Sequence, residues 1–505
     1  MGLRSDRPAR LPAVIQGGMG VAISGWRLAR AVARLGQLGV VSGTALETVH
    51  ARRLGDGDPG GHLRRAYAAF PEPTLAERVL GRWFLPGGRA SGQPYRDVPM
   101  FLLQSPQALR ELTVLANFAE VHLAKIGHDG PIGINYLEKI QLPTPDALYG
   151  AMLGGVDYVF MGAGIPAALP RLLDKLALGD EVSYRIDVAG ASGGEGHAVR
   201  FRPPDVVGRR LGLARPGFVA VVSSSTLASF LAKDPATRPD GFVVEHHSAG
   251  GHNAPPRGPA TSDERGQPLY GERDEVDLGK IAALGLPFWL AGGCASPEGL
   301  VRARASGAAG IQVGTAFALC LESGLSPDLR ERVLASSRSG ETEVLTDGRA
   351  SPSGYPFKVL QLGGTLSDPA VYSARRRRCD VGLLRTPYLR PDGGIGYRCP
   401  SEPVGAYLRK GGSRAETAGR ICLCNALLST AGLGQQRAAG PEPPVVTMGD
   451  DLDRLVRVLG EHGAWSAADV VAYLLGDQGG AQAPIAVPAP QLSAASGLSK
   501  EVVGR

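Results

Sequence analysis

The chain has 505 residues, of which 43% are hydrophobic, 6% aromatic and 20% charged, and its net charge at pH 7 is +6. This length allows one large domain with extensions, or two to three domains. The 71 glycines follow no three-residue period, which excludes collagen. The small net charge gives no reason to expect a nucleic-acid partner, and the basic run at 375–378, which has no interleaved aromatic residues, predicts a solvated surface turn.

The chain also lacks the sequence features of a membrane or secreted protein. No apolar stretch approaches the about 20 residues needed to span a bilayer. Met1 to Asp6 include charged residues but no apolar segment follows them before the first predicted strand, so the N-terminus does not resemble a signal peptide. Asp6 stands where a myristoylation motif requires serine or threonine. We therefore expect a cytoplasmic protein whose six cysteines are reduced.

Short apolar runs that end in small or polar residues recur along the chain and indicate buried strands. They lie at residues 13–15, 40–41, 131–134, 158–160, 218–222, 241–244, 287–290 and 310–313. Helical patterns separate many of them, including 26–35, which Ser24 can cap, and 297–306. Eight strands alternating with helices predict an α/β fold, a (β/α)₈ TIM barrel. An open doubly wound sheet is the alternative, but no G-x-G-x-x-G fingerprint follows the first run.

The barrel pattern covers residues 1–346 and contains two unusually long connections. Residues 47–130 exceed a normal connection and predict an inserted lid or subdomain near the barrel mouth, with a helix from Pro106 to Ile126. Residues 180–216 are rich in glycine and arginine and predict a long loop. The first connection is therefore the candidate cover of any site at the mouth.

After Asp347 the barrel pattern stops, and residues 347–435 form a C-terminal extension with four cysteines. These cysteines are Cys379, Cys399, Cys422 and Cys424. They are compatible with zinc or an iron–sulfur cluster, but their spacing is not that of a standard zinc finger. Reduced structural thiols are the other interpretation, and we assign no metal ligand. Cys294 and Cys320 lie in barrel segments and are interpreted as packing residues.

The last segment, residues 436–505, is predicted to hold a linker, a helix and a tail. The linker is expected at 437–444 and the helix at 450–475. Residues 476–496 are rich in alanine, proline, glutamine and glycine, a composition that indicates disorder.

The most informative segment runs from Glu245 to His252. It follows an apolar run, so a strand delivers the pair Gly250-Gly251 and then His252 to one end of the sheet. Paired glycines let the main chain press close to a flat ligand, and imidazole suits proton transfer near neutral pH. Adjacent residues at a strand end point to opposite faces, so at most one of His246 and His247 faces that ligand.

Two further glycine turns follow the seventh and eighth apolar runs. Gly292-Gly293 and Gly314-Thr315 each precede a predicted helix, and the corresponding loops of barrels commonly bind a phosphate. Bare N–H groups and the helix dipole attract an anion to such a helix N-terminus. Each turn alone is explained by tight-turn geometry, but the two together, at matching barrel positions, favour phosphate binding.

In this order along the chain, these blocks resemble a known family. Pro12 to Gly43 resembles the opening of the nitronate monooxygenase family, formerly the 2-nitropropane dioxygenases, which flavin-dependent enoyl-acyl carrier protein reductases share. The Gly-Gly-His run that ends at His252 is similar to the family's Glu-x-Gly-Gly-His signature, and Leu290 to Gly314 resembles its phosphate-loop region. The resemblance extends over roughly Pro12 to Gly324.

The resemblance implies a TIM barrel with non-covalent FMN and with His252 as the catalytic base. The implied cofactor-binding residues are Gln16, Gly17, Gly18 and Met19 along the flavin ring, Asn135 bonded to it, Gly251 near it, and Gly292, Gly293, Gln312, Gly314 and Thr315 at the phosphate. The implied reaction is the oxidation of alkyl nitronates or nitroalkanes by O2 to a carbonyl product and nitrite.

The sequence departs from this family in ways that leave the substrate open. Four residues, His246 to Ala249, separate Glu245 from the glycine pair where the family has one or two. Arg257 lies in a rigid basic turn and is either a ligand for an acidic substrate group or a surface residue. An NAD(P)H-dependent enoyl-thioester reductase and a flavin-binding subunit of a biosynthetic complex are the alternatives. We expect a small-molecule substrate, O2 or NAD(P)H as co-substrate, and no nucleic-acid or membrane partner. A homodimer is one assembly that the chain could form.

Overall fold

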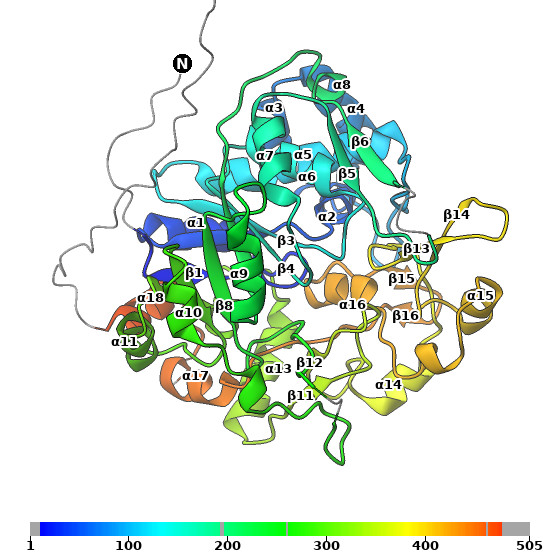
Figure 1. Ribbon diagram of the computed structural model, residues 1–505. Coiled ribbons are helices and arrows are strands. Elements are labelled where there is room, and N and C mark those ends of the chain that lie inside the picture. The colour runs from blue at the N-terminus through cyan, green and yellow to red at the C-terminus, as the bar shows by residue number, and fades with distance from the viewer. Residues whose placement is uncertain (1–10, 192–195, 259–260, 461–462, 477–505) are drawn as a thin grey trace, which may run out of the picture.

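A computed structural model of the chain describes residues 11–191, 196–258, 261–460 and 463–476 (Figure 1). Two predictions concern residues outside these ranges. They are the prediction for Met1 to Asp6 and, apart from Gly476, the prediction of a disordered tail. None of the helices in the described ranges combines the length and the apolar character that a bilayer crossing requires.

Eight parallel strands close into a barrel in the order β1-β10-β9-β8-β7-β4-β3-β2. They are β1 (Val14–Gln16), β2 (Leu38–Ser42), β3 (Ile132–Leu137), β4 (Tyr158–Gly162), β7 (Gly217–Val222), β8 (Gly241–Glu245), β9 (Phe288–Ala291) and β10 (Gly310–Val313). Each of the eight predicted apolar runs contributes one strand. The predicted α/β TIM barrel is thereby confirmed, and the open sheet is excluded.

The interior of the barrel is packed with side chains that alternate along each strand. Ile15, Phe160 and Trp289 are at most 2% exposed there, as expected for a barrel whose centre is a core. The Trp289 indole N–H donates to the Pro12 carbonyl at 2.8 Å and closes the amino-terminal end. Space for a ligand is therefore left at the carboxyl ends of the strands.

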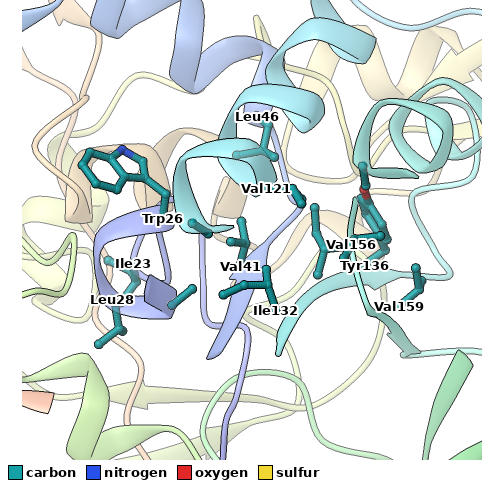
Figure 2. Packing of buried hydrophobic residues seen from close by; sticks show 14 of the residues in the cluster. Ile23, Trp26, Leu28, Val41, Leu46, Val121, Ile132, Tyr136, Val156 and Val159 are labelled. Atoms are coloured by element: carbon teal, nitrogen blue, oxygen red, sulfur yellow. The ribbon is translucent and has the colours of Figure 1, made fainter. Parts of the chain in front are cut away.

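The outer faces of the strands pack against a ring of helices in a second, larger core. The helices are α1 (Trp26–Arg34), α5 (Gln107–Lys125), α6 (Thr144–Leu153), α7 (Leu169–Ala177), α9 (Ser225–Lys233), α10 (Leu278–Ala282), α11 (Pro297–Ala305), α12 (Thr315–Ala318) and α13 (Pro327–Arg338). Figure 2 shows part of this core, in which Val41 and Ile132 of neighbouring strands lie near Leu46 and Val121. The alternation places Val41 outward and its neighbour Val40 inward.

Helix α1 begins as predicted, but Ser24 does not cap it. Instead, the Trp26 amide donates to Glu120 Oε2 of α5 at 2.9 Å. Burial alone would raise the pKa of Glu120, yet the hydrogen bond with His50 and the charge of Arg53 lower it to about 2. The charged carboxylate of a distant helix thus replaces the predicted local cap.

Residues 47–130 form a helical layer on the outside of the barrel. The layer consists of α2 (Leu46–Gly55), the 3₁₀ turn η1 (Pro59–Gly61), α3 (His62–Ala68), α4 (Pro73–Trp83) and α5. The long α5 confirms the helix predicted at 106–126, and it packs against α1, α2, α3, α4 and α6. No residue of 47–130 lines the central cavity described below. The segment therefore does not occupy the lid position expected for it.

Residues 180–216 are not the plain loop that their glycine and arginine content suggested. Strand β5 (Val182–Arg185) pairs antiparallel with β6 (Ala198–Phe201), and α8 (Pro204–Val207) follows. Along β5, Val182 and Tyr184 are buried while the residues between and after them are exposed. This two-residue alternation was the available signal, and the surrounding polar residues masked it.

The C-terminal extension folds around a small core of its own beside the barrel (Figure 1). Its elements are β11 (Val344–Asp347), β12 (Phe357–Leu360), α14 (Pro369–Ala374), β13 (Thr386–Leu389), β14 (Ile395–Arg398), α15 (Val404–Arg409), the turn η3 (Ala415–Thr417), α16 (Leu423–Thr430), β15 (Gln436–Arg437) and β16 (Gly440–Pro441). The chain then returns to the barrel, where α18 (Ala467–Leu475), after α17 (Leu452–Leu459), packs on α1 and α11.

The predicted linker and one residue of the basic run take part in this fold. The predicted linker contains the β15–β16 pair, and Arg437 forms ion pairs with Asp380 at 2.6 Å and Glu442 at 3.2 Å. Arg375, from the basic run, also pairs with Glu442, and both of these side chains are less than 10% exposed. Arg375 is buried because the Glu442 carboxylate, distant in the sequence, neutralises it.

Candidate active site

A large cavity opens at the carboxyl ends of the barrel strands. Its empty volume is about 1600 Å³ with the open mouth included. The predicted site residues that line it are Gly17, Gly18, Met19, Asn135, Gly251, His252, Gly292, Gly293, Gln312, Gly314 and Thr315.

Gln16 is the one predicted site residue that does not line the cavity. Its neighbour Ile15 points into the barrel, so the alternation of β1 turns Gln16 outward. There it is fully buried; its Nε2 donates to Ser24 Oγ at 2.9 Å, and its Oε1 accepts from the Val40 amide at 3.1 Å. The expectation that Gln16 lies along a flavin ring is therefore wrong.

Ser24 connects this buried amide to the first glycine turn. Its hydroxyl donates to the Gly17 carbonyl at 3.0 Å and accepts from the Met19 amide at 3.0 Å. Gln16 and Ser24 together fix the turn that faces the cavity. Their contribution to the site is positioning, which the sequence did not reveal because Ser24 was interpreted as a helix cap.

His252 lines the cavity from the loop after β8. Its Nε2 shares a hydrogen bond of 2.7 Å with Ser351 Oγ, and its ring packs edge-on against Phe357 at 4.8 Å between centroids. Burial lowers the pKa of His252 to about 4. The imidazole is therefore neutral at pH 7, which is the protonation state that a general base requires.

The segment that carries His252 is paired with the C-terminal extension as an added strand. His252 forms an antiparallel bridge with Phe357 of β12, and the Lys358 amide donates to the Gly251 carbonyl at 2.9 Å. On the other side, the Gly251 amide donates to Thr447 Oγ1 at 2.8 Å. The extension therefore sets the position of the histidine, although no local pattern near Gly251 indicated a partner.

The turns after β9 and β10 have the backbone shape that glycine permits. Gly292 has φ +90° and Gly293 φ +66°, and a Cβ on Gly292 would lie 2.9 Å from the His246 carbonyl. The Ser296 hydroxyl caps α11, so that N-terminus is less bare than predicted. Gly314 precedes α12, which has no side-chain cap, and a short extra helix at this place is typical of barrel phosphate sites.

Two acidic residues, Glu245 and Asp451, line the cavity, and among the described lining residues there is no lysine or arginine. Burial raises the pKa of Glu245 to about 7. Burial also raises the pKa of Asp451, against the opposing effect of Arg454, which lies 3.5 Å away. An anion at the glycine turns would therefore be held by main-chain N–H groups. Arg454, which pairs with Asp451, does not itself line the cavity.

Two groups of residues line the cavity. The first, which we name the floor, comprises the glycine turns at Gly17–Met19, Gly292–Gly293 and Gly314–Thr315. The second, which we name the roof, comprises Leu427 and Thr430 of α16 and residues 446–449. The roof was missed by the sequence analysis because its residues lie more than a hundred positions beyond the last barrel strand and follow no motif.

The roof is tied directly to the floor by hydrogen bonds. The Gly449 amide donates to Thr315 Oγ1 at 2.9 Å. The Asp450 amide donates to the Ser248 carbonyl at 3.1 Å. These bonds join α12 and the loop after β8 to the last part of the chain. The C-terminal segment, and not residues 47–130, therefore contributes to the lining of the cavity.

The four cysteines of the extension are free. Cys379 is close enough to Cys399 and Cys422 for electrostatic interaction with them. However, no three of the sulfur atoms lie within 4.8 Å of one another. A tetrahedral zinc site would bring all four to about 4 Å, given Zn–S bonds of about 2.3 Å. Burial raises the pKa of all four thiols, including Cys424. The metal site and the reduced structural thiols both stay predictions.

Several other candidates lie away from the cavity. His246, His247 and Arg257 are not among its lining residues, although Cys294, interpreted as a packing residue, is. The Arg257 guanidinium donates to the Arg273 carbonyl at 2.6 Å, and the Arg257 amide donates to Asp274 at 2.7 Å. Arg257 therefore fixes its own loop and is not placed to bind a substrate in the cavity.

The family model of the nitronate monooxygenases matches residues 197–360. The match includes the Gly-Gly-His segment and both glycine turns that follow it. It extends past Gly324, where the predicted resemblance ends, to the end of β12. It does not include Pro12 to Gly43, whose likeness to the family stays a prediction.

Comparison with curated proteins gives no match. Among solved structures, FabK from Thermotoga maritima is 16% identical, with a TM-score of 0.46 over 93% of each chain. Nitroalkane oxidase from Streptomyces ansochromogenes is 14% identical, with a TM-score of 0.42 over 92% of this chain and 95% of that chain. Likenesses this distant do not determine the reaction. The family-model match confirms the predicted resemblance: residues 197–360 of this chain are similar to the nitronate monooxygenases, a family of oxidoreductases.

Proposed function

We propose that this protein binds FMN and oxidises alkyl nitronates or nitroalkanes with O2 to a carbonyl product and nitrite. One observation carries the proposal. A single cavity brings together the glycine turns after β1, β9 and β10 and the imidazole of His252. The match to the nitronate monooxygenase family over residues 197–360 supports the same reaction class.

The residues present fit FMN. A Cβ on Gly18 would lie 2.4 Å from Asn135 Cβ, and a Cβ on Gly292 would meet the His246 carbonyl, so only glycine leaves these surfaces flat. Gly17, Gly18 and Met19, with Asn135, would hold the ring, and the amides after β9 and β10 would hold the phosphate. When bound, FMN supplies the redox chemistry between the substrate and O2.

His252 would remove the α-proton of a neutral nitroalkane. The bond to Ser351 engages Nε2, which leaves Nδ1 as the nitrogen for proton transfer. A positioned general base contributes about 10²- to 10⁴-fold to the rate. Because burial lowers the pKa of His252 to about 4, the base form is present at neutral pH. A preformed nitronate has already lost this proton and does not need the histidine.

A second candidate is an NAD(P)H-dependent enoyl-thioester reductase, and the composition of the roof favours it. Leu427, Val446 and Met448, which are apolar, line the cavity. Such a surface suits an extended acyl chain. In this reaction NAD(P)H would replace the nitronate as the electron donor.

Anaerobic spectroscopy of the purified full chain separates these reactions. The flavin spectrum is followed while NADPH, and in a second sample a nitronate, is added. Bleaching by the nitronate alone supports the monooxygenase, and rapid bleaching by NADPH supports the reductase. Bound flavin with turnover of neither substrate indicates a binding subunit, and a colourless protein that refuses added FMN contradicts the proposal.

The His252→Ala variant tests the role of the base. We expect retained FMN, a loss of about 10²- to 10⁴-fold on neutral nitroalkane and a smaller loss on the preformed nitronate. His62→Ala is the matched control, because His62 pairs with Arg65 outside the cavity. An equal loss on both substrates would remove the base role while leaving the flavin assignment intact.

A further inference from the structure

A cluster of metal-ligand side chains lies directly behind the cavity and is not used by the proposed reaction. His246 and His247 follow β8, and Glu275 follows the 3₁₀ turn η2 (Glu272–Asp274). Each residue offers one ligand atom, and the three atoms lie within 4.8 Å of one another. His246 Nε2 is 3.6 Å from Glu275 Oε1. None of the three lines the cavity.

Both imidazoles are held in place by neighbouring groups. His246 Nδ1 shares a hydrogen bond of 2.8 Å with Ser248 Oγ and accepts one of 3.2 Å from the Ser248 amide. These two bonds hold the ring. His247 stacks on Tyr270 at 4.0 Å and 10°, and the Tyr270 hydroxyl is anchored to the Ala254 carbonyl at 3.0 Å. Such second-shell contacts orient metal-binding histidines.

The chemistry of the three side chains restricts the kind of ion that they can bind. Two imidazoles with one carboxylate suit zinc, cobalt, nickel or copper, whereas magnesium and calcium prefer all-oxygen sites.

We propose that His246, His247 and Glu275 bind a divalent first-row transition-metal ion, with water in the remaining positions. The site does not depend on the flavin chemistry proposed above. Its place suggests a consequence for the cavity, because the His246 carbonyl and Ser248 Oγ are 2.9 and 3.0 Å from where a Cβ on Gly292 would lie. A bound ion would fix the loop between β8 and His252 against the turn after β9.

Titration calorimetry with Zn²⁺ on the chelator-treated full chain tests the site. We expect one ion per chain, and binding at least about 10-fold weaker in His247→Ala and Glu275→Ala, because each variant removes a direct ligand. The Glu275 side chain is 69% exposed, so its removal should leave the fold intact. Unfolding temperatures measured without metal check this point. His62→Ala is the matched control and should bind like the wild type.

Co²⁺ spectra distinguish this site from the cysteines. Cobalt bound through imidazole and carboxylate lacks the intense near-ultraviolet band of cobalt thiolates. A spectrum without that band, lost in His247→Ala, supports the proposal. A thiolate band, Zn²⁺ affinity equal in all variants, or the absence of Zn²⁺ binding would overturn it. Because the titration needs neither FMN nor turnover, its outcome is independent of the proposed oxidoreductase activity.

Discussion

The floor and the roof of the cavity are made from different parts of the polypeptide. On the floor the contacts come from main chain at glycine turns, such as Gly292 and Gly314, at the ends of barrel strands. On the roof they come from side chains such as Leu427 and Met448, far along the chain. We therefore propose that the floor holds the cofactor and that the roof selects the substrate.

Damage to the floor should have the largest effect. In Gly292→Val the new Cβ meets the His246 carbonyl at 2.9 Å, and the backbone has φ +90°. We expect the dissociation constant of FMN to rise at least about 100-fold, which corresponds to about 2.7 kcal/mol. Flavin fluorescence quenching measures this constant.

Gly307→Val is the matched control for that variant. Its φ of +86° imposes a similar backbone strain, but the nearest atom to a Cβ is 3.8 Å away and Gly307 is outside the cavity. FMN affinity should stay within about twofold of the wild type, because only backbone strain is added. Equal losses in the two variants would show that strain, and not the floor surface, controls binding.

Gln16→Met tests whether the residue beneath the floor is structural. The substitution leaves the Val40 amide and Ser24 Oγ without their buried partner. We expect the free energy of unfolding to fall by about 2 kcal/mol, with a much smaller effect on FMN binding than in Gly292→Val. Urea unfolding measures the first quantity, and the exposed Gln107→Met provides the baseline. A loss of FMN without a loss of stability would restore the direct role that the sequence suggested.

The pH dependence of stability should reveal the buried His252. Its folded pKa is about 4 because of burial, and its unfolded value is about 6.5. Between these values the unfolded chain binds more protons, so the free energy of unfolding falls as the pH drops from 6.5 to 4, by at most about 1.4 kcal/mol per pH unit from this group. In His252→Gln this part of the slope should vanish. An unchanged slope would mean that the ring is solvated.

Ser351→Ala probes the hydrogen bond between the C-terminal extension and His252. We expect kcat on neutral nitroalkane to fall about 10-fold, the worth of one buried hydrogen bond, with KM and bound FMN unchanged. Ser353→Ala, which removes only a neighbour of Ser351, should have less effect. A change in KM alone would indicate that Ser351 contacts the substrate and does not position the base.

The smallest effect is expected at the roof. Leu427→Trp fills part of the cavity from α16 and should raise KM severalfold for long substrates. The effect should be small because the side chains at a cavity can move, whereas overpacking a closed core costs about 1–3 kcal/mol. FMN affinity should not change. Leu408→Trp, at an exposed position of α15, is the control. Weaker FMN binding in Leu427→Trp would blur the division between floor and roof.

The barrel and the floor were predictable because they are local. Apolar runs such as 310–313 are followed by glycine, and the period of two within a strand marks the inward side chains. The same period explains the error at Gln16, which directly follows the inward-facing Ile15. The β5–β6 pair was missed because its alternation is short and is surrounded by glycine and arginine.

The roof and the support of His252 were not predictable because they depend on contacts between distant segments. Nothing near Ser351 or Thr447 in the sequence points to residues 251–252. The buried carboxylates give the same result. Glu120 accepts a hydrogen bond from the first turn of α1, and Glu442 neutralises Arg375, only after the chain has folded. Pairings of this kind follow no periodicity that a single sequence displays.

The strand pairing between β12 and residues 251–253 limits how this enzyme can be divided. A fragment that stops at residue 346 would retain every barrel strand but would leave the histidine loop as an unsatisfied sheet edge. Grafting a new specificity onto the barrel therefore requires that β12 be transplanted with the roof. Chimaeras made between related proteins should therefore keep β12 and residues 251–253 from the same parent. A recombination breakpoint at the end of the barrel should yield inactive chimaeras.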